Sequence, residues 1–512
     1  MAKTLKNNRA KVVLVGAGPG DPALLTLKAV DYLQRADVVV YDHLANERIL
    51  AHCQPDAELI YVGKKAGTHT LPQNEINDLL IEKAREQRLT VRLKGGDPFI
   101  FGRGGEEVLA FYDAGIDFEV VPGITAGIAA LSYAGIPATQ RGDATSVSFI
   151  TGHEDPTKPE SGLNWPAIAG MQGTLIFYMG IKNLPVICQN LMKHGKAPDT
   201  PVALVRWGTL PRQQTITGKL DTIARLAQEK KFQAPALIIV GEVVRYREKM
   251  NWFEKKPLFG KRIVITRARA QNSELDAQLR ELGADVLQFP TIRIEPPHSR
   301  QALDEAIDRI SGFDWLLFTS VNGVQFFLER LKAKEHDCRY LHPVKIAAIG
   351  PATGERLRQN GIFPDLQPPK FVAESLLEAI RRQGSITGKR FLLPRAEEAR
   401  SILVDELSRA GAIVKEITAY RTVVETEQRK DLTEKIQKGE IDLITFTSSS
   451  TVKNFVTLIG EREMRNLPDV AIACIGSITK KTAEKFGLSC RLMPNEYTIP
   501  GLVKEIVDYY RK

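Results

Sequence analysis

Glycine-rich loops in the first half of the chain have residue types suited to holding a ligand against the main chain. The first contains the sequence GAGPGD at residues 16–21. A dinucleotide fingerprint needs glycine where Asp21 stands, and a carboxylate there would repel a pyrophosphate. Pro19 also lacks the N–H group that a phosphate would use. The loop therefore disfavours NAD and FAD, and it fits either a tight strand-to-helix turn or a phosphate-free ligand that approaches the main chain closely.

A second loop, LKGGDPFIFGRGGE at residues 93–106, contains five glycines. Glycine permits positive φ and removes the Cβ atom where a ligand meets main chain, and five in one loop exceed the needs of a single turn. Asp97 could accept hydrogen bonds from ribose hydroxyls or from an ammonium group. A third loop, VPGITA at residues 121–126, opens a helix, and its Thr125 is either a ligand contact or a helix N-cap.

Hydroxyl side chains occur at two equivalent places in the second half of the chain. Thr319 and Ser320 follow one expected strand, and Thr447, Ser448 and Ser449 follow another. Each set precedes an expected helix, whose N-terminus could bind carboxylates together with the hydroxyls. Helix capping is the simpler interpretation of any single one of them. Two equivalent sets facing one cleft favour a ligand role for the group.

Alternating strands and helices are expected to position the loops of the first half. The pattern is typical of an α/β fold, and the almost entirely apolar segment 36–41 indicates a strand buried in a parallel sheet. The expected strands are 12–15, 36–41, 90–93, 117–121, 147–151, 174–179, 201–206 and 236–240, and the expected helices are 22–34, 74–87, 106–114 and 124–134.

The second half contains a weak internal duplication. The sequence IVITRA at 263–268 is echoed by FLLPRA at 391–396, FTS at 318–320 recurs at 446–448, and IAAIG at 346–350 is echoed by IACIG at 472–476. A steady offset of about 127 residues predicts two similar α/β lobes with a cleft for a large ligand between them. Chain order predicts that the lobes exchange segments: residues 261–288 with 424–512 in one, and 289–423 in the other.

Bulk composition limits the class of protein. The chain has 512 residues, of which 43% are hydrophobic and 26% charged, as in ordinary soluble proteins. We find no apolar run of about 20 residues that would span a membrane. Five scattered cysteines without a C-x-x-C pair suggest neither disulfides nor a metal site, so we expect the cytoplasm. The net charge of +9 suits a polyanionic small substrate; the nucleic-acid alternative lacks a basic run with interleaved aromatic residues.

Seven segments, in order along residues 11–250, resemble uroporphyrinogen-III C-methyltransferase. They are GAGPGD (16–21), VVYD (39–42), VGKKAG (62–67), RLKGGDPFIFGRGGEE (92–107), VPGITA (121–126), FYMG (177–180) and ALIIVG (236–241). The resemblance implies S-adenosylmethionine as methyl donor and a tetrapyrrole carrying eight carboxylates as acceptor. It also implies the donor-binding residues, which are Pro19, Gly95, Gly96, Asp97, Ile100, Thr125, Ala126, Met179, Gly208 and Ala236.

The same resemblance suggests which residues move protons and hold the acceptor. Asp42 would be the proton acceptor and Lys64 a proton donor. The alternatives are a helix or turn cap for Asp42, and a solvated surface lysine or a carboxylate anchor for Lys64. Arg92, Arg103 and Arg141 would hold carboxylates of the acceptor, with a solvated structural arginine as the simpler interpretation of each.

Residues 261–512 resemble uroporphyrinogen-III synthase, through less specific segments. These are ITRA (265–268), LLFTSVNGV (316–324), IAAIGPATG (346–354), EITAYRT (416–422), ITFTSSSTV (444–452) and ACIGSIT (473–479). The resemblance implies cyclisation of hydroxymethylbilane to uroporphyrinogen III without a cofactor. Tyr420 would donate a hydrogen bond or a proton to the leaving group; the alternative is a half-buried packing tyrosine.

Together these features predict a bifunctional α/β enzyme of tetrapyrrole biosynthesis. A two-lobed methyltransferase at residues 1–250 is expected to be joined by a linker at 251–260 to a two-lobed synthase at 261–512. The expected product is precorrin-2, for siroheme or a corrinoid, and the resemblance suggests a homodimer without nucleic-acid or membrane partners. Three alternatives remain: a dehydrogenase, an RNA methyltransferase, and a methyltransferase fused to a non-catalytic two-lobed ligand-binding module.

Overall fold

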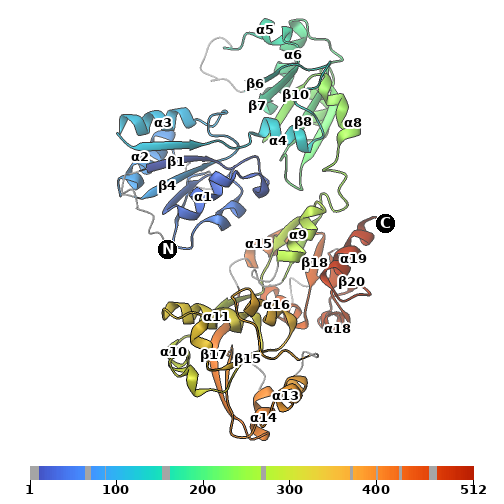
Figure 1. Ribbon diagram of the computed structural model, residues 1–512. Coiled ribbons are helices and arrows are strands. Elements are labelled where there is room, and N and C mark those ends of the chain that lie inside the picture. The colour runs from blue at the N-terminus through green and yellow to red at the C-terminus, as the bar shows by residue number, and fades with distance from the viewer. Residues whose placement is uncertain are drawn as a thin grey trace. The chain divides into compact units, whose positions relative to one another are not determined.

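The computed structural model describes residues 11–63, 71–86, 88–152, 162–266, 273–368, 373–398, 402–425, 429–460, 467 and 470–511. The chain forms two compact units (Figure 1). The first comprises Met1–Lys261, Leu279–Asp285 and Tyr510–Lys512, and the second comprises Arg262–Gln278 and Val286–Tyr509. Each unit contains two five-stranded sheets covered by helices. The expected fold class, α/β with two lobes in each half, is confirmed.

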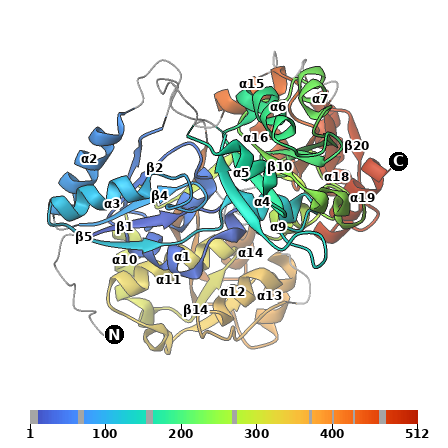
Figure 2. The same cartoon turned by 90° about the horizontal axis from the view of Figure 1, so that it is seen from above.

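The first sheet of the first unit is parallel in its pairings and has the strand order β3-β2-β4-β1-β5. Because successive side chains of a strand point to opposite faces, Val13 and Val15 pack on the α1 side, whereas Val12 and Leu14 pack on the side of α2 and α3 (Figure 2). The elements are β1 (Lys11–Gly16), α1 (Leu27–Arg35), β2 (Val38–Tyr41), β3 (Glu58–Tyr61), α2 (Gln73–Arg85), β4 (Leu89–Lys94), α3 (Gly104–Asp113) and β5 (Asp117–Val121).

The expected helix over 22–34 is divided in two. A short 3-10 helix, η1, covers Pro22–Leu24, and α1 starts only at Leu27. Thr26 causes the restart, because its Oγ1 accepts a hydrogen bond from the Ala29 amide at 3.1 Å and caps α1.

The second sheet of the first unit is mainly antiparallel, with the order β6-β7-β10-β8-β9. Only β6 and β7 pair in parallel; β10 runs antiparallel to β7 and β8, and β8 to β9. Helices α5, α6 and α7 cover one face and α4 covers the other. The elements are α4 (Ala126–Tyr133), β6 (Val147–Thr151), α5 (Trp165–Gly170), β7 (Thr174–Tyr178), α6 (Leu184–Lys193), β8 (Pro201–Arg206), β9 (Gln214–Lys219), α7 (Ile223–Glu229), β10 (Ala236–Val240) and α8 (Arg247–Met250).

Residues 251–260, the expected linker, pack closely within the first unit. Phe253 and Leu258 are buried. Glu254 accepts hydrogen bonds from Gln213 at 2.8 Å and Thr215 at 2.7 Å.

Among the described residues, no helix has the length and apolar character needed to cross a membrane.

The two sheets of the second unit have the orders β12-β11-β18-β19-β20 and β13-β17-β16-β14-β15. The adjacent strands β11, β18 and β19 of one sheet correspond to β16, β14 and β15 of the other, which are the strands that carry the repeated sequences. The predicted similarity of the two lobes is therefore confirmed. One edge differs from a parallel sheet, because β13 pairs antiparallel with β17.

Strands and helices alternate along most of the second unit, except that β13 follows β12 and α13 follows α12 directly. They are β11 (Arg262–Ile265), α9 (Ser273–Glu281), β12 (Asp285–Gln288), β13 (Ile292–Glu295), α10 (Gln301–Asp308), β14 (Trp315–Phe318), α11 (Val321–Ala333), β15 (Lys345–Ala348), α12 (Pro351–Arg358), α13 (Ala373–Arg381), β16 (Arg390–Ala396), α14 (Ile402–Arg409), β17 (Ile413–Val424), α15 (Arg429–Gln437), β18 (Leu443–Phe446), α16 (Ser449–Ile459), β19 (Ala471–Cys474), α18 (Ser477–Lys485), β20 (Cys490–Leu492) and α19 (Ile499–Arg511).

Candidate active sites

The three glycine-rich loops of the first unit meet main chain to main chain where β1, β4 and β5 end. The amide of Gly96 donates to the carbonyl of Gly18 at 2.7 Å, and the amide of Gly18 donates to the carbonyl of Gly96 at 3.1 Å. A Cβ atom on Gly16 would lie 2.4 Å from the amide nitrogen of Gly123, and one on Gly123 would lie 2.2 Å from the carbonyl oxygen of Gly96. Only glycine fits at positions 16 and 123, so these loops present backbone rather than side chains.

Two aspartates fasten these loops. Asp97 accepts the Phe99 amide at 2.8 Å through Oδ1 and the Gly123 amide at 3.0 Å through Oδ2. Asp21 accepts the Ala23 amide at 3.0 Å and the hydroxyl of Tyr133 at 2.9 Å. Burial and the Asp21 charge raise the pKa of Tyr133, so this tyrosine stays a donor. Each carboxylate oxygen keeps lone pairs for a ligand, so the structural role of Asp97 does not exclude ligand binding.

Thr125 occupies the N-cap position of α4, but its side chain does not cap the helix. Its Oγ1 lies 2.8 Å from the hydroxyl of Tyr178, which also accepts the Gly127 amide at 2.7 Å. Burial raises the pKa of Tyr178. The ring of Phe101 packs on Tyr178 with 4.9 Å between centroids. Tyr178 thus holds the third loop in place, a role that its sequence position in an apolar strand did not indicate.

Backbone strain concentrates in the same region. Five non-glycine residues near the loops have positive φ: Phe101, Arg103, Met179, Trp207 and Thr209. Only Lys231 shares this property among the other described residues of the first unit. Such conformations cost of order 1–3 kcal/mol each and cluster at functional sites. Phe101, Trp207 and Thr209 were not among the residues expected from the sequence; the signal that they share is a glycine next to them in the chain.

The remaining expected donor-site residues line the same region. A Cβ atom on Gly95 would meet Leu44 at 2.6 Å, and one on Gly208 would meet Ala130 of α4 at 2.3 Å. Ile100 and Ala126 pack partly buried on the core beside Ala130. Met179 is exposed and Pro19 is partly exposed, and Ala236 starts β10 opposite Arg206.

Two arginines stack on one tryptophan at the end of β8. The guanidinium carbon of Arg206 lies 3.7 Å from the ring centre of Trp207, and that of Arg212 lies 4.7 Å from it. Burial and the Arg212 charge lower the pKa of Arg206. Neither guanidinium is paired with a carboxylate in the part of the chain that the structure describes. A cationic surface of this kind suits a carboxylate ligand.

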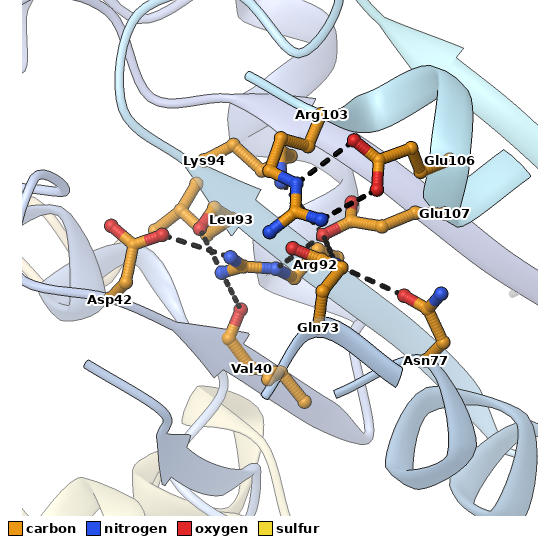
Figure 3. Close-up of polar contacts among 10 residues, drawn as sticks. All are labelled: Val40, Asp42, Gln73, Asn77, Arg92, Leu93, Lys94, Arg103, Glu106 and Glu107. Atoms are coloured by element: carbon orange, nitrogen blue, oxygen red, sulfur yellow. Dashed lines mark hydrogen bonds and ion pairs between the residues drawn. The ribbon is translucent and has the colours of Figure 1, made fainter. Parts of the chain in front are cut away.

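Asp42 follows β2 and lies against a buried polar cluster (Figure 3). Its Oδ1 accepts the Leu44 amide at 3.0 Å, as expected for a turn, and its Oδ2 accepts from Nη2 of Arg92 at 2.9 Å. Arg92 is only 3% exposed, so its guanidinium is held inside the fold instead of being presented to a solvated substrate. Behind it, Glu107 accepts from Lys94 at 2.7 Å, and burial, reinforced by the Arg92 charge, lowers the pKa of Lys94.

The other two expected arginines are accessible. Arg103 is exposed and forms a hydrogen-bonded ion pair with Glu106 at 2.6 Å. Arg141 is exposed on the loop between α4 and β6. Lys64, the expected proton donor, lies outside the described residues.

In the second unit, Tyr420 on β17 is buried and lies next to a helix start. Its hydroxyl is 3.1 Å from Oγ of Ser320, which caps α11 by accepting the Gly323 amide at 3.0 Å. The ring of Phe326 stacks on Tyr420 with 5.8 Å between centroids. The structure thus brings together Tyr420 and Ser320, which lie far apart in the sequence.

The hydroxyl residues occupy equivalent places in the two lobes. Ser448 caps α16 in a capping box with Thr451, just as Ser320 caps α11. Ser449 accepts from the hydroxyl of Thr482 at 3.0 Å. Thr319 and Thr447 precede the caps, are partly exposed, and make no side-chain hydrogen bond within the described part of the chain. Capping therefore accounts for the serines at 320 and 448, and the two threonines remain available to a ligand.

Comparison with known proteins identifies both halves. The family "Tetrapyrrole (Corrin/Porphyrin) Methylases" matches residues 11–224, and "Uroporphyrinogen-III synthase HemD" matches residues 273–504. Over 500 residues the chain is 37% identical to the porphyrin biosynthesis protein HemD of Ruminiclostridium josui, covering 97% of each. It is 42% identical over 357 residues to the uroporphyrinogen-III C-methyltransferase of Bacillus subtilis, covering 70% of this chain and 73% of that protein. It is 53% identical over 244 residues to the S-adenosyl-L-methionine-dependent uroporphyrinogen III methyltransferase of Methanosarcina barkeri, covering 48% of this chain and 96% of that protein.

Proposed function

Because the chain belongs to the tetrapyrrole methylases through residues 11–224 and to the uroporphyrinogen-III synthases through residues 273–504, we propose that it is a bifunctional enzyme making two consecutive steps. The second unit closes hydroxymethylbilane to uroporphyrinogen III with loss of water. The first unit then methylates that product twice with S-adenosylmethionine to give precorrin-2. A porphyrin biosynthesis protein that is similar over 97% of the chain supports a role for both halves in porphyrin biosynthesis.

The donor loops fit S-adenosylmethionine, a sulfonium cation with an amino acid tail and no phosphate. Residues 16–21, 95–97 and 121–126 contain no lysine or arginine that would hold a phosphate, and they contain the carboxylates Asp21 and Asp97. Close main-chain packing of Gly16, Gly96 and Gly123 leaves backbone amides and carbonyls to contact the ligand. The close main-chain packing of these glycines, beside two carboxylates, is the observation that carries the choice of donor. We propose Gly95, Gly96, Asp97, Thr125, Ala126, Gly208 and the other donor residues named from the sequence as its contacts.

When bound, the donor supplies a methyl group that is transferred as CH₃⁺, with the S–CH₃ electrons returning to sulfur. The acceptor pyrrole carbon is electron-rich, so the chain contributes mainly position, which can supply much of the acceleration. The macrocycle loses one proton for each methyl gained, and we propose Asp42 as the proton acceptor and Lys64 as the proton donor. Arg103, Arg141 and the Arg206–Trp207–Arg212 stack would hold acceptor carboxylates.

For the second unit we propose that Tyr420 donates a hydrogen bond to the departing hydroxyl of hydroxymethylbilane. Its placement by Ser320 at 3.1 Å supports a fixed hydroxyl direction. Thr319, Thr447 and Ser449, with the starts of α11 and α16, would hold substrate carboxylates. In Tyr420→Phe we expect the cyclisation rate to fall about 100-fold or more, as for loss of a positioned proton donor. Stopped-flow formation of uroporphyrinogen III measures this; an unchanged rate would favour a packing role.

Residues 1–250, 251–260 and 261–512 are our proposed boundaries for the methyltransferase, the linker and the synthase. A homodimer formed through the methyltransferase half, and a cytoplasmic setting for five free cysteines, complete the proposal.

One experiment tests both activities on the whole chain. Purified protein receives hydroxymethylbilane with and without S-adenosylmethionine, and the products are separated by isomer and mass. We expect type III uroporphyrinogen without the donor and a dimethylated product with it. Spontaneous type I product alone would show that the second unit only binds ligand, and an unmethylated type III product with donor present would refute the methyltransferase assignment.

A further inference from the structure

The cluster behind Asp42 contains more buried charge than the proposed proton transfer uses. Arg92, Lys94 and Glu107 are 3%, 4% and 0% exposed, whereas the side chain of Asp42 is 23% exposed. Two cations face two carboxylates, so the cluster is neutral when all four groups are ionised. Burying ions costs several kcal/mol each unless partners compensate, and an apolar core would avoid that cost. The arrangement therefore needs a reason beyond stability.

Glu107, in the first turn of α3, gathers its donors on one oxygen. Lys94 Nζ at 2.7 Å, Gln73 Nε2 at 3.0 Å and Arg92 Nε at 3.4 Å all reach Oε1. Oε2 is buried and accepts no hydrogen bond from the described residues. A carboxylate with one crowded oxygen and one unsatisfied oxygen is not arranged for maximum stability. Its geometry serves the donors: Lys94 is the nearest of them, and Arg92 is the one that continues to Asp42.

Arg92 connects Glu107 to Asp42, and Figure 3 shows it lying between the two carboxylates. The guanidinium donates in three directions: Nε to Glu107, Nη1 to the Leu93 carbonyl at 2.9 Å, and Nη2 to Asp42 at 2.9 Å. Because the group is planar, these three directions fix both its place and its rotation. With the Leu44 amide on the other oxygen, the plane of the Asp42 carboxylate is fixed as well.

We propose that Glu107 is a positioning residue for methyl transfer, acting through Arg92 to set the orientation and charge balance of Asp42. The inference rests on the proposed function, in which Asp42 accepts the proton that the macrocycle loses. That proton ends on Asp42, and Glu107 exchanges none. Without the Glu107 charge, two buried cations face a single carboxylate, which favours ionised Asp42 and makes it a weaker proton acceptor.

A double-mutant cycle on the full chain, supplied with uroporphyrinogen III and S-adenosylmethionine, tests this. Glu107→Gln keeps the side-chain shape and removes the charge. We expect kcat to fall about tenfold, KM for the donor to stay within about twofold, and the acid limb of the pH–rate profile to move to lower pH. In an Asp42→Asn background, the same substitution should change kcat by less than about twofold, because the carboxylate through which Glu107 acts is already absent.

Glu119→Gln is the matched control. Glu119 on β5 of the same sheet also accepts from three side chains, Lys11, Lys28 and Tyr32, which lower its pKa to about 2. Its loss should reduce thermal stability without changing kcat or the pH profile. If Glu107→Gln does not fold, Gln73→Ala removes one donor from Oε1 at a partly exposed position. We expect a smaller decrease in kcat of the same sense.

The outcomes separate the inference from the function on which it rests. Wild-type kcat and pH profile in Glu107→Gln, or in Gln73→Ala where that variant is needed, overturn the inference, as do equal losses in the two backgrounds. Wild-type protein that binds S-adenosylhomocysteine yet transfers no methyl, or Asp42→Asn with wild-type kcat, overturns the proposed function instead.

Discussion

Asp97 combines loop fixation and the proposed donor contact in a single carboxylate. Its two oxygens accept hydrogen bonds from the Phe99 amide at 2.8 Å and from the Gly123 amide at 3.0 Å. Asp97 therefore links the second glycine-rich loop to the third. The sequence predicted only the ligand role, because hydrogen bonds to the amide of a residue 26 positions away leave no pattern in the chain. Loss of this side chain should therefore weaken donor binding in two ways, through the lost contact and through the released loop.

In Asp97→Ala we expect the affinity for S-adenosylhomocysteine to fall about 10- to 100-fold, as for loss of hydrogen bonds to a charged group worth about 1.5–3 kcal/mol. The KM for uroporphyrinogen III should change far less, because the proposed carboxylate contacts lie elsewhere. Isothermal calorimetry with the donor product and steady-state kinetics with the acceptor measure the two effects. Wild-type calorimetric affinity would contradict the donor site proposed here.

Arg92 illustrates what residue types alone could not reveal. An arginine at the end of a strand, beside a glycine-rich loop, was expected to bind a substrate carboxylate. Its burial depends on α2 and α3 covering that face of the sheet and on Glu107 being placed beneath it. The sequence did contain one usable signal: charged side chains alternate with apolar ones at Arg92 and Lys94, within an otherwise buried strand. Alternation of that kind places both cations on one face.

At the scale of elements, burial determined which strands could be predicted. The strands at the centre of the sheets, such as β1, β2 and β8, are apolar runs and were expected within a few residues of their observed bounds. Two strands without such runs, β3 and β9, were missed because they are largely half-exposed at sheet edges. The antiparallel pairing of β10 with β7 and β8 was also missed, since pairing direction depends on the route of the connections.

The crossing of the three glycine-rich loops gives a prediction for these elements. In Gly123→Ala the added Cβ would lie 2.2 Å from the carbonyl oxygen of Gly96, and backbone cannot move aside cheaply. We expect a loss of about 1–3 kcal/mol in the free energy of unfolding, as for other overpacked sites, together with weaker donor binding. Gly105→Ala is the matched control, because nothing lies within 4 Å of its added Cβ in α3. Helix propensity predicts a gain of up to about 1 kcal/mol there. Thermal unfolding measures the stability of both variants. Equal changes in stability would contradict the close approach of Gly123 to the Gly96 carbonyl.

At the scale of the whole molecule, the duplicated sequence and the exchange of chain segments produce two similar sheets in the second unit. The first unit instead combines a parallel and a mainly antiparallel sheet. The chain as a whole carries an excess of positive charge, with 70 lysines and arginines against 61 aspartates and glutamates. An excess of positive charge accelerates and strengthens the binding of a polyanion in a salt-dependent manner. The two proposed ligands of the first unit differ in this respect, since one carries eight carboxylates and the donor product is close to neutral.

Salt should therefore separate the binding of the acceptor from that of the donor. Raising ionic strength from about 0.05 to 0.5 M shortens the screening length roughly threefold, and we expect KM for uroporphyrinogen III to rise several-fold. The dissociation constant of S-adenosylhomocysteine should stay within about twofold, because its contacts are mainly to backbone.

Arg212→Gln, which removes one unpaired cation from the Trp207 stack, should raise the KM for uroporphyrinogen III at low salt and flatten its salt dependence. The control is Arg225→Gln, whose arginine is already paired with Glu229 at 2.7 Å on α7. A KM that is insensitive to salt, or equal effects of the two arginine variants, would show that the stack does not hold an acceptor carboxylate.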